Sequence, residues 1–181
     1  MINMLRQWLK SDQPAPDDSA VTARILMVCT GNICRSPTAE GVLRAKLKQA
    51  GLEALVRVDS AGTHGYHTAE PPDPRAIQAA AKRGYNIADL QARPMRPEDF
   101  SRFTWLLAMD QTNMDWLQKR GTEGATARPA LLMPLARKSR GLIEVPDPYF
   151  GGPAGFERVL DLVEDACDGV VDRLRAGRHL D

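Results

Sequence analysis

Cysteine and histidine are scarce in this sequence, and so are aromatic residues. Its 181 residues include three cysteines, three histidines, four phenylalanines, three tryptophans and three tyrosines. Three cysteines do not make a disulfide framework, which indicates a reducing compartment. With no signal-peptide segment either, the expected location is cytoplasmic. No apolar run approaches the ~20 residues that cross a bilayer, so no membrane span is expected.

The sequence also lacks an excess of charge of either sign. It has 24 lysines and arginines against 23 aspartates and glutamates. This balance gives no indication of binding to nucleic acid or to a membrane surface, so any recognition of charge must be local. The length fits one domain with a substantial core. The oligomeric state is not indicated.

The N-terminal segment differs in composition from the rest. Apolar residues in 1–10 have the spacing of a short amphipathic helix, and 11–20 contains two prolines and three aspartates, as linkers do. We expect an N-terminal extension and linker over 1–20, outside the core, and one domain over 21–181. The extension would dock on the domain, bind a partner or be disordered, and the sequence leaves these alternatives open.

Short apolar runs alternate with helical patterns after this extension. The expected strands cover residues 25–28, 55–59, 103–108 and 130–133. Helices are expected after Ser36-Pro37, after Asp73-Pro74 and after Asp110, and a long one over 155–174. Such alternation predicts parallel βαβ units. The expected fold is a single α/β domain with a doubly wound parallel sheet of about four strands flanked by helices.

The residues that carry chemistry follow the first strand directly. Residues 29–37 read CTGNICRSP, a tight turn that enters a helix. Backbone N–H groups and the helix dipole make such a turn a site for a phosphate dianion. The Arg35 guanidinium can donate two parallel hydrogen bonds to phosphate oxygens, and the positive field favours a thiolate at Cys29. The motif therefore places a nucleophile beneath the anion that it would attack.

Cys29 also fits two other interpretations. A free cysteine after an apolar run is commonly an inert core residue, but Cys29 lies at the carboxyl end of a strand, where open α/β sheets bind ligands. The other is a zinc site. Its ligands would be Cys29, Cys34, His64 and His67. Their spacing matches no common zinc motif, and Arg35 would place a cation beside the metal.

Residues 29–37 resemble the C-T-G-N-I-C-R-S-P signature of the low-molecular-weight protein tyrosine phosphatases, in particular those of the bacterial type. Asp147-Pro148-Tyr149 resembles the distant D-P-Y element of that family. Three further segments are similar to the family in the same order, at 60–63, 71–75 and 108–110. The similarity covers the chain from about Arg24 to Leu174.

The resemblance implies a protein-tyrosine-phosphatase that hydrolyses phosphotyrosine and small aryl phosphates through a phosphocysteine. It implies that Cys29 is the nucleophile, Arg35 binds phosphate, and Asp147 is the general acid that later activates water. No metal or other cofactor is needed, because the loop and Arg35 supply the positive charge. The implied partner is a phosphotyrosine-containing protein, such as a bacterial tyrosine kinase.

The remaining expected site residues bind substrate or support the loop. They are Thr30, Gly31, Asn32, Ile33, Cys34, Ser36, Tyr66, Tyr149 and Phe150. Ser36 would donate a hydrogen bond to the thiolate, and Asn32 would brace the turn. Phe150 stands where the family commonly has a second tyrosine. Leu90 stands where several relatives have a histidine, which calls the family's Asn–His brace into question.

The other two cysteines have different expected roles. Cys34 would either capture an oxidised Cys29 as a disulfide or only pack beneath the loop. Cys167 lies on the apolar stripe of the last helix and is expected to be a small buried core residue. A redox relay would need accessible thiols, which disfavours a thioredoxin-linked arsenate reductase on the same fold. A non-catalytic phosphotyrosine-binding module would require neither Cys29 nor Asp147.

Overall fold

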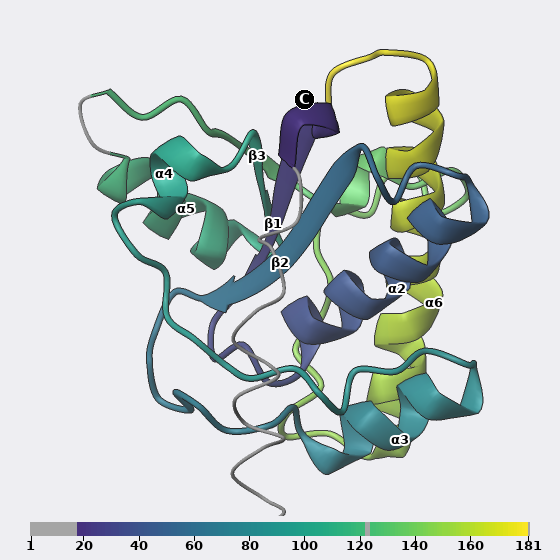
Figure 1. The fold of residues 1–181 in the computed structure, drawn as a ribbon. Coiled ribbons are helices and arrows are strands. Elements are labelled where there is room, and N and C mark those ends of the chain that lie inside the picture. The colour runs from purple at the N-terminus through teal and green to yellow at the C-terminus, as the bar shows by residue number, and fades with distance from the viewer. Residues whose placement is uncertain (1–17, 122–123, 181) are drawn as a thin grey trace, which may run out of the picture.

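The computed structural model describes residues 18–121 and 124–180 and contains one parallel sheet (Figure 1). The strand order is β2-β1-β3-β4. The strands are β1 (Ala23–Cys29), β2 (Val56–Gly62), β3 (Trp105–Ala108) and β4 (Arg128–Leu131). All paired neighbours run parallel, so each connection must cross over the sheet. The expected doubly wound sheet of about four strands is confirmed.

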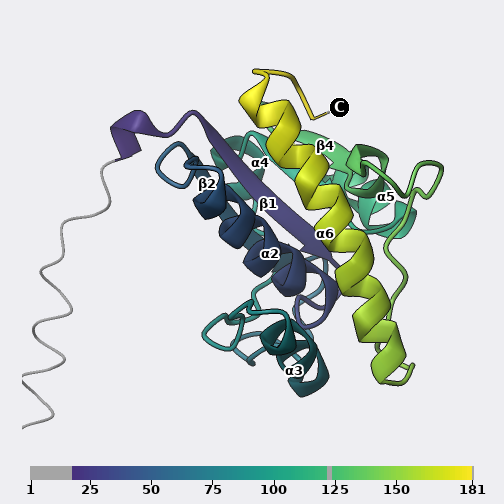
Figure 2. The same ribbon diagram turned by 90° about the vertical axis from the view of Figure 1, so that its right-hand side faces the viewer.

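Helices cover both faces of the sheet. One face carries α2 (Arg35–Gln49), α3 (Pro74–Lys82) and α6 (Pro153–Arg175), and the other carries α4 (Asp99–Arg102) and α5 (Gln111–Arg120). In Figure 2, α6 runs beside α2 across β1. Two short 3-10 helices complete the elements, η1 (Asp18–Ala20) and η2 (Met133–Leu135). No helix of the described residues is long and apolar enough to span a membrane.

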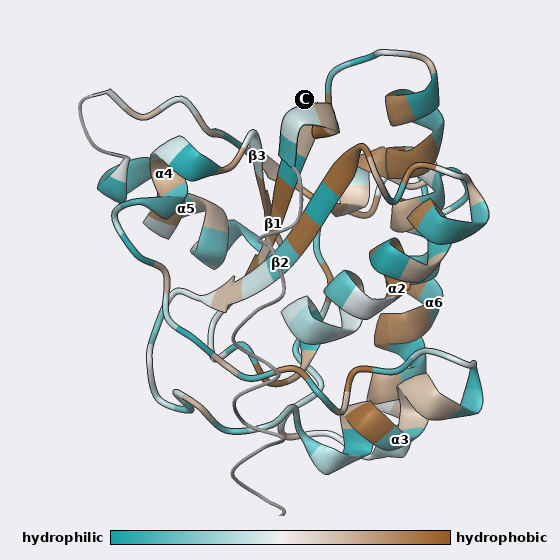
Figure 3. Ribbon diagram, in the orientation of Figure 1, coloured by the Kyte–Doolittle hydropathy of each residue, from teal (hydrophilic) through white to brown (hydrophobic). Residues whose placement is uncertain are grey.

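The central strand β1 explains why the first apolar run is continuous. Ile25 and Met27 belong to the larger core under α2, α3 and α6, whereas Leu26 and Val28 belong to the smaller core under α4 and α5. A strand with helices on both faces buries successive side chains on opposite sides, and β1 is accordingly mostly hydrophobic in Figure 3, whereas β2 has hydrophilic positions as well. The run therefore marks the centre of the sheet.

Several element boundaries differ from expectation. Strand β3 begins at Trp105 rather than at residue 103, and β4 covers Arg128–Leu131 rather than 130–133. Two further differences bear on the site. Helix α2 begins at Arg35, with Cys34 at the N-cap, rather than after a Ser36 cap. The Ser36 hydroxyl caps no helix because it contacts the Cys29 sulfur, 3.1 Å away. Strand β2 continues to Gly62 rather than ending at Asp59, because its last residues pair with Met27 to Cys29 of β1. Because α2 begins earlier and β2 ends later, regular structure borders the loop after β1 more closely than expected.

The sheet topology places that loop at a switch point. Strand β1 pairs with β2 on one side and with β3 on the other. The chain therefore builds the sheet outward from one edge of β1 first and adds the later strands at its other edge. Ligands of open α/β sheets bind at the carboxyl ends of the strands at such a point. Residues 1–17 of the expected N-terminal extension lie outside the described residues. Asp18, at the start of η1, pairs with Arg24 and Arg57 of the sheet.

Candidate active site

The loop between β1 and α2 has the geometry of an anion site. Cys29 ends β1, and residues 30–34 carry the chain into α2. Within the described residues, the following backbone N–H groups have no hydrogen-bond acceptor: Thr30, Gly31, Ile33 and Cys34. Backbone donors left open at the entrance to a helix bind anions, and the helix dipole adds positive potential. The loop can therefore hold several oxygens of a phosphate.

Asn32 braces this loop from beneath. Its φ of 57° is a left-handed conformation that asparagine tolerates. The Asn32 amide donates to Ser36 Oγ and Ser60 Oγ, both at 2.9 Å, and its oxygen accepts from the Arg93 backbone at 2.9 Å. Leu90 packs against the core. The loop is thus tied to α2, β2 and the segment before α4 without a side chain from position 90.

A directional chain of hydrogen bonds ends at the Cys29 sulfur. The buried Glu40 carboxylate accepts from Ser60 Oγ at 2.5 Å, so the Ser60 oxygen is free to accept from Asn32. Ser36 also accepts from Asn32, and the nearer acceptor for its single proton is Cys29 Sγ at 3.1 Å, with the Ala61 carbonyl at 3.5 Å. Burial raises the pKa of Glu40 even though Arg44 and Ser60 oppose that effect. The chain leaves the Ser36 hydroxyl free to donate to the Cys29 sulfur.

Cys29 lies at the base of a pocket, at the margin of the larger core. The residue is buried, and its sulfur accepts from the Asn32 N–H at 3.3 Å as well as from Ser36. The pocket above it has a volume of about 270 Å³. It is lined by Cys29, Thr30, Gly31, Ile33, Cys34, Arg35, Tyr66, His67, Asp147, Tyr149 and Phe150. All the expected site residues line this pocket except Asn32 and Ser36, which support it from below.

The Arg35 guanidinium is anchored along one edge and open along the other. Its Nη1 donates to Asp110 Oδ2 at 2.5 Å and to the Val145 carbonyl at 3.2 Å. Its Nη2 contacts Asp147 Oδ2 at 3.0 Å, and Nε has no partner within the described residues. Burial alone would lower the pKa of Arg35, but negative charge at Cys29 and the two aspartates raises it. The Nε and Nη2 edge can therefore engage two oxygens of one phosphate.

Asp147 is held at the mouth of the pocket. It lies between Pro146 and Pro148, which restrict the backbone, and its Oδ1 accepts from the Tyr149 N–H at 3.0 Å. Its other oxygen pairs with Arg35, yet the side chain is 52% exposed. A phosphate on the Nη2 edge of Arg35 would displace this carboxylate toward the opening. There it would face the leaving group of a bound phosphate ester.

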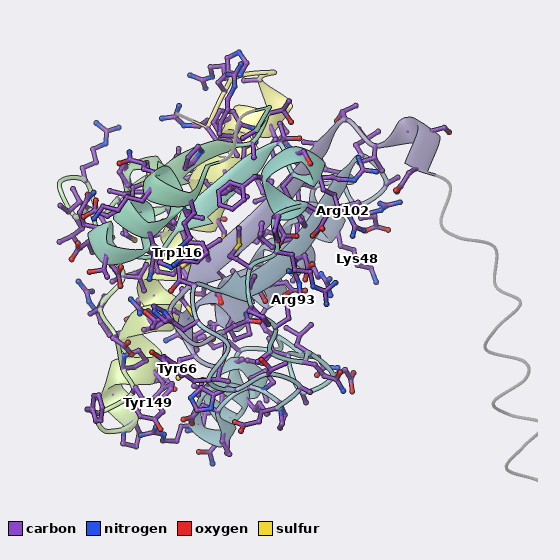
Figure 4. The ribbon with its side chains drawn as sticks, turned by 90° about the vertical axis from the view of Figure 1, so that its left-hand side faces the viewer. Lys48, Tyr66, Arg93, Arg102, Trp116 and Tyr149 are labelled. Carbon is purple, nitrogen blue, oxygen red and sulfur yellow. The ribbon has the colours of Figure 1, made fainter. Side chains whose placement is uncertain are left out.

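Aromatic rings form the upper walls of the pocket. Tyr66 is 73% exposed and stacks on His64, with ring centroids 5.1 Å apart. Tyr149 meets Phe150 edge to face at 5.0 Å, and Phe150 is almost fully exposed. Figure 4 places Tyr66 and Tyr149 on the same side of the molecule. Exposed rings above a deep anion site suit a flat aryl group.

Sequence reasoning missed two residues of the site. Asp110 was expected only to cap α5, which it does through Asn113, but it also orients Arg35. His67 lines the pocket, with its ring against Gly31 and its Nδ1 2.7 Å from Glu70. The signals at Asp110 are the helix-capping pattern and the family-like segment 108–110. Its pairing with Arg35 is not visible in the sequence, because the two residues are 75 positions apart and meet only in the folded chain.

The histidines of the zinc alternative are engaged elsewhere. His64 Nδ1 is 2.9 Å from Thr63 Oγ1, and His67 pairs with Glu70. Among the described residues, no three side chains of histidine, cysteine, aspartate or glutamate are arranged to hold a metal ion. Cys167 is fully buried in α6, as expected for a core residue.

Comparison with known proteins gives a consistent result. The family model described as low molecular weight phosphotyrosine protein phosphatase matches residues 24–179. A putative low molecular weight protein-tyrosine-phosphatase of Synechocystis is 44% identical over 83% of this chain and 96% of its own. A low molecular weight protein-tyrosine-phosphatase of Streptomyces coelicolor is 43% identical over 86% and 95%. The crystal structure of an Entamoeba histolytica protein tyrosine phosphatase superposes with a TM-score of 0.81 at 37% identity, covering 86% of this chain and 99% of that one.

Proposed function

The chain belongs to the low molecular weight phosphotyrosine protein phosphatase family, and we propose that it hydrolyses phosphotyrosine in proteins, and small aryl phosphates, through a phosphocysteine. One observation carries this proposal. The Cys29 sulfur, the open edge of Arg35 and the Asp147 carboxylate meet in a single pocket above unpaired backbone N–H groups. The family of the chain supports the same chemistry.

The reaction consists of two in-line displacements. The Cys29 thiolate attacks phosphorus, and the protonated Asp147 gives its proton to the departing tyrosyl oxygen. A phosphorus–sulfur bond forms as the phosphorus–oxygen ester bond breaks. Asp147 then takes a proton from water, which attacks phosphorus and releases the Cys29 thiolate with inorganic phosphate. Arg35 and the loop N–H groups hold the equatorial oxygens throughout.

The walls of the pocket favour an aryl ester over other phosphates. Tyr66 and Tyr149 flank the opening, and Ile33 adds an apolar surface. A phosphoserine has no ring to place between the aromatic walls. A phosphoarginine would place a guanidinium against apolar walls in a pocket where, of the residues that the structure describes, Asp147 is the one carboxylate in the lining. Phosphotyrosine supplies the flat ring.

Turnover of p-nitrophenyl phosphate and of matched phosphopeptides tests the proposal. The wild type should hydrolyse the phosphotyrosyl peptide and leave phosphoseryl and phosphoarginyl peptides of the same sequence largely intact. Cys29→Ser should fold and bind vanadate but lose turnover, because a hydroxyl is a far weaker nucleophile at neutral pH. Cys167→Ala is the matched control and should keep turnover. Activity retained in Cys29→Ser would refute the mechanism.

The wider setting of the enzyme is also proposed. Its substrate is a tyrosine-phosphorylated protein, and a bacterial tyrosine kinase would be one such partner. A cytoplasmic location is supported by three free thiols. The catalytic domain would cover 21–181, with 1–20 as an extension outside the core. A variant without residues 1–17 should therefore retain turnover of p-nitrophenyl phosphate.

Cys34 would protect the nucleophile from irreversible oxidation. Peroxide converts the Cys29 thiolate to a sulfenic acid, and the Cys34 thiol then displaces water to form a disulfide. Burial, followed by the charges of Asp73 and Cys29, raises the pKa of Cys34 to about 12. Cys34 is therefore a thiol in the resting enzyme. Oxidation of Cys29 removes one of those negative charges, which eases proton loss from Cys34 at the moment when it must react.

An arsenate reductase relay is disfavoured by the position of the last cysteine. Cys167 is fully buried, and burial raises its pKa. It cannot exchange disulfides with an external protein unless α6 leaves the core. A non-catalytic binding module is disfavoured because Ser36 and the chain leading to Glu40 are arranged to stabilise a thiolate, which binding alone does not need.

A further inference from the structure

A second groove lies on the side of the molecule that faces the viewer in Figure 4. Its volume is about 370 Å³. The floor is apolar and consists of Met95, Phe100 and Trp116, and the rim carries Thr63, Arg96 and Arg120. None of these residues lines the catalytic pocket. We call this feature the Trp116 groove.

The two arginines of the Trp116 groove lack carboxylate partners. Other arginines of the structure form ion pairs. Arg83, for example, pairs with three carboxylates of α6. Within the described part of the chain, neither Arg96 nor Arg120 forms an ion pair. Arg120 instead lies over the Trp116 ring, 4.7 Å from its centroid. A guanidinium held on an aromatic face keeps its outward N–H groups available for a carboxylate.

The buried carboxylate of Asp99, three residues after Arg96, is already neutralised. Asp99 accepts from the Arg96 backbone N–H at 2.8 Å, but its charge is paired with the Arg93 guanidinium at 2.9 Å. Asp99 is also buried, so it does not present its charge to the groove. The Trp116 groove therefore combines an apolar floor with two arginines that form no ion pair among residues 18–121 and 124–180.

The Trp116 groove and the catalytic pocket are linked by the short chain segment 63–66. Thr63 on its rim bonds with His64 at 2.9 Å, and His64 stacks on Tyr66 of the aromatic wall. Thr63 and Tyr66 are three residues apart, so their Cα atoms are at most ~11 Å apart. Figure 4 shows Trp116 above Tyr66 and Tyr149 on the same side. An extended peptide leaving the pocket would reach the groove within a few residues.

We propose that the Trp116 groove docks an acidic segment of the phosphoprotein substrate. The segment would lie roughly three to six residues from the phosphotyrosine, given the reach of an extended chain. Its carboxylates would pair with Arg96 and Arg120, and its apolar atoms would cover the ring of Trp116. This inference rests on the proposed phosphotyrosine phosphatase activity and adds a preference for sequence around the phosphotyrosine.

Reversing the charge of the two arginines on the rim distinguishes docking of the peptide from hydrolysis in the catalytic pocket. The double variant Arg96→Glu/Arg120→Glu should hydrolyse p-nitrophenyl phosphate with unchanged kcat/KM, since that substrate does not reach the groove. For phosphotyrosyl peptides with glutamates three to six positions before or after the phosphotyrosine, KM should rise about fivefold or more, as expected for two exposed ion pairs. Peptides with serine at those positions should show little change. The difference should shrink at high salt.

A matched control is available on the same helix. Lys119→Glu makes the same charge change as the single variant Arg120→Glu, to which it is compared, and lies in the last turn of α5, but Lys119 does not line the groove. It should not alter the preference for acidic peptides. An equal loss in Lys119→Glu, or equal losses on the glutamate and serine peptides, would overturn the proposal. The double variant Arg96→Gln/Arg120→Gln removes the two charges without reversing them. It should show the same selective rise in KM, but a smaller one, and it replaces the charge-reversal variant if that variant does not fold.

Binding without turnover distinguishes failure of docking from failure of the proposed activity. The unphosphorylated glutamate peptide should bind Cys29→Ser weakly and saturably by calorimetry, and Arg96→Glu/Arg120→Glu in that background should abolish binding. If the wild type lacks phosphatase activity but this binding is seen, the proposed activity is refuted and the proposed docking site is supported. No binding, or equal binding of the serine peptide or of a nucleotide, would overturn the docking site.

Discussion

Replacing Asp110 by asparagine should impair phosphate binding without unfolding the protein. Asp110 Oδ2 accepts from Arg35 Nη1 at 2.5 Å, and Oδ1 caps α5 by accepting from the Asn113 N–H at 2.8 Å. Asparagine keeps an oxygen for the cap and is itself a favoured N-cap residue. It removes the charge that anchors the guanidinium, so the substitution separates the two roles of this residue.

The expected size of the effect follows from the contact. A hydrogen bond to a charged group contributes about 1.5–3 kcal/mol, and a neutral acceptor keeps part of that. A loss of about 1.4 kcal/mol is a tenfold change. We therefore expect kcat/KM for p-nitrophenyl phosphate to fall about tenfold and the inhibition constant of inorganic phosphate to rise by a similar factor. The Arg35 side chain would remain paired with Asp147, which competes with phosphate for Nη2.

Steady-state kinetics and thermal unfolding test this reasoning together. Asp110→Asn should unfold close to the wild type, whereas Asp110→Ala, which also loses the cap, should be less stable by about 1 kcal/mol. Both variants should bind phosphate more weakly. Wild-type kinetics and phosphate inhibition in Asp110→Asn would refute the orienting role of Asp110. A stability loss equal to that of Asp110→Ala would refute the separation of the two roles.

Three further predictions concern the acid, the second cysteine and the buried glutamate. Asp147→Asn should reduce turnover of phenyl phosphate far more than that of p-nitrophenyl phosphate, whose leaving group needs little protonation, and equal losses would remove Asp147 from the acid role. After treatment with peroxide, dithiothreitol should restore the activity of the wild type, and peptide mapping before reduction should find a Cys29–Cys34 disulfide. If Cys34→Ser recovers its activity as completely as the wild type, Cys34 does not protect Cys29 and only packs beneath the loop. Burial raises the pKa of Glu40, so its contribution to stability is present below the ordinary glutamate pKa and is lost as pH rises through the raised value. Urea unfolding should show Glu40→Gln gaining stability relative to the wild type from about pH 4 upward, and a difference independent of pH would contradict the shift.

The fold was predictable because local signals agreed. The continuous apolar run at 25–28 marks a strand covered on both faces, and Asp73 and Asp110 cap α3 and α5 as expected. The long periodic stretch at 155–174 lies within α6. The start of α2 was placed too late, since the Ser36 side chain serves the Cys29 sulfur instead of the helix end. Capping statistics do not anticipate a hydroxyl that is used for another contact.

The site was predictable only where its residues are adjacent in sequence. Cys29 to Ser36 form one motif, whose spacing predicts the loop, and the roles assigned to them remain predictions. The partners of Arg35 and Asn32 lie far away in the chain, at Asp110, Ser60 and the Arg93 backbone. These contacts depend on how strands and helices pack. A pattern of residues along the chain does not contain that information.

Trapping of the covalent intermediate tests the central claim most directly. Asp147→Asn slows the attack of water, so acid quenching during turnover of p-nitrophenyl phosphate should preserve a phosphoryl group on the enzyme. Peptide mapping by mass spectrometry should place it on Cys29, and Cys29→Ser should accumulate none. A phosphoryl group on another residue, or steady turnover with no covalent intermediate and an active Cys29→Ser, would contradict catalysis through a phosphocysteine.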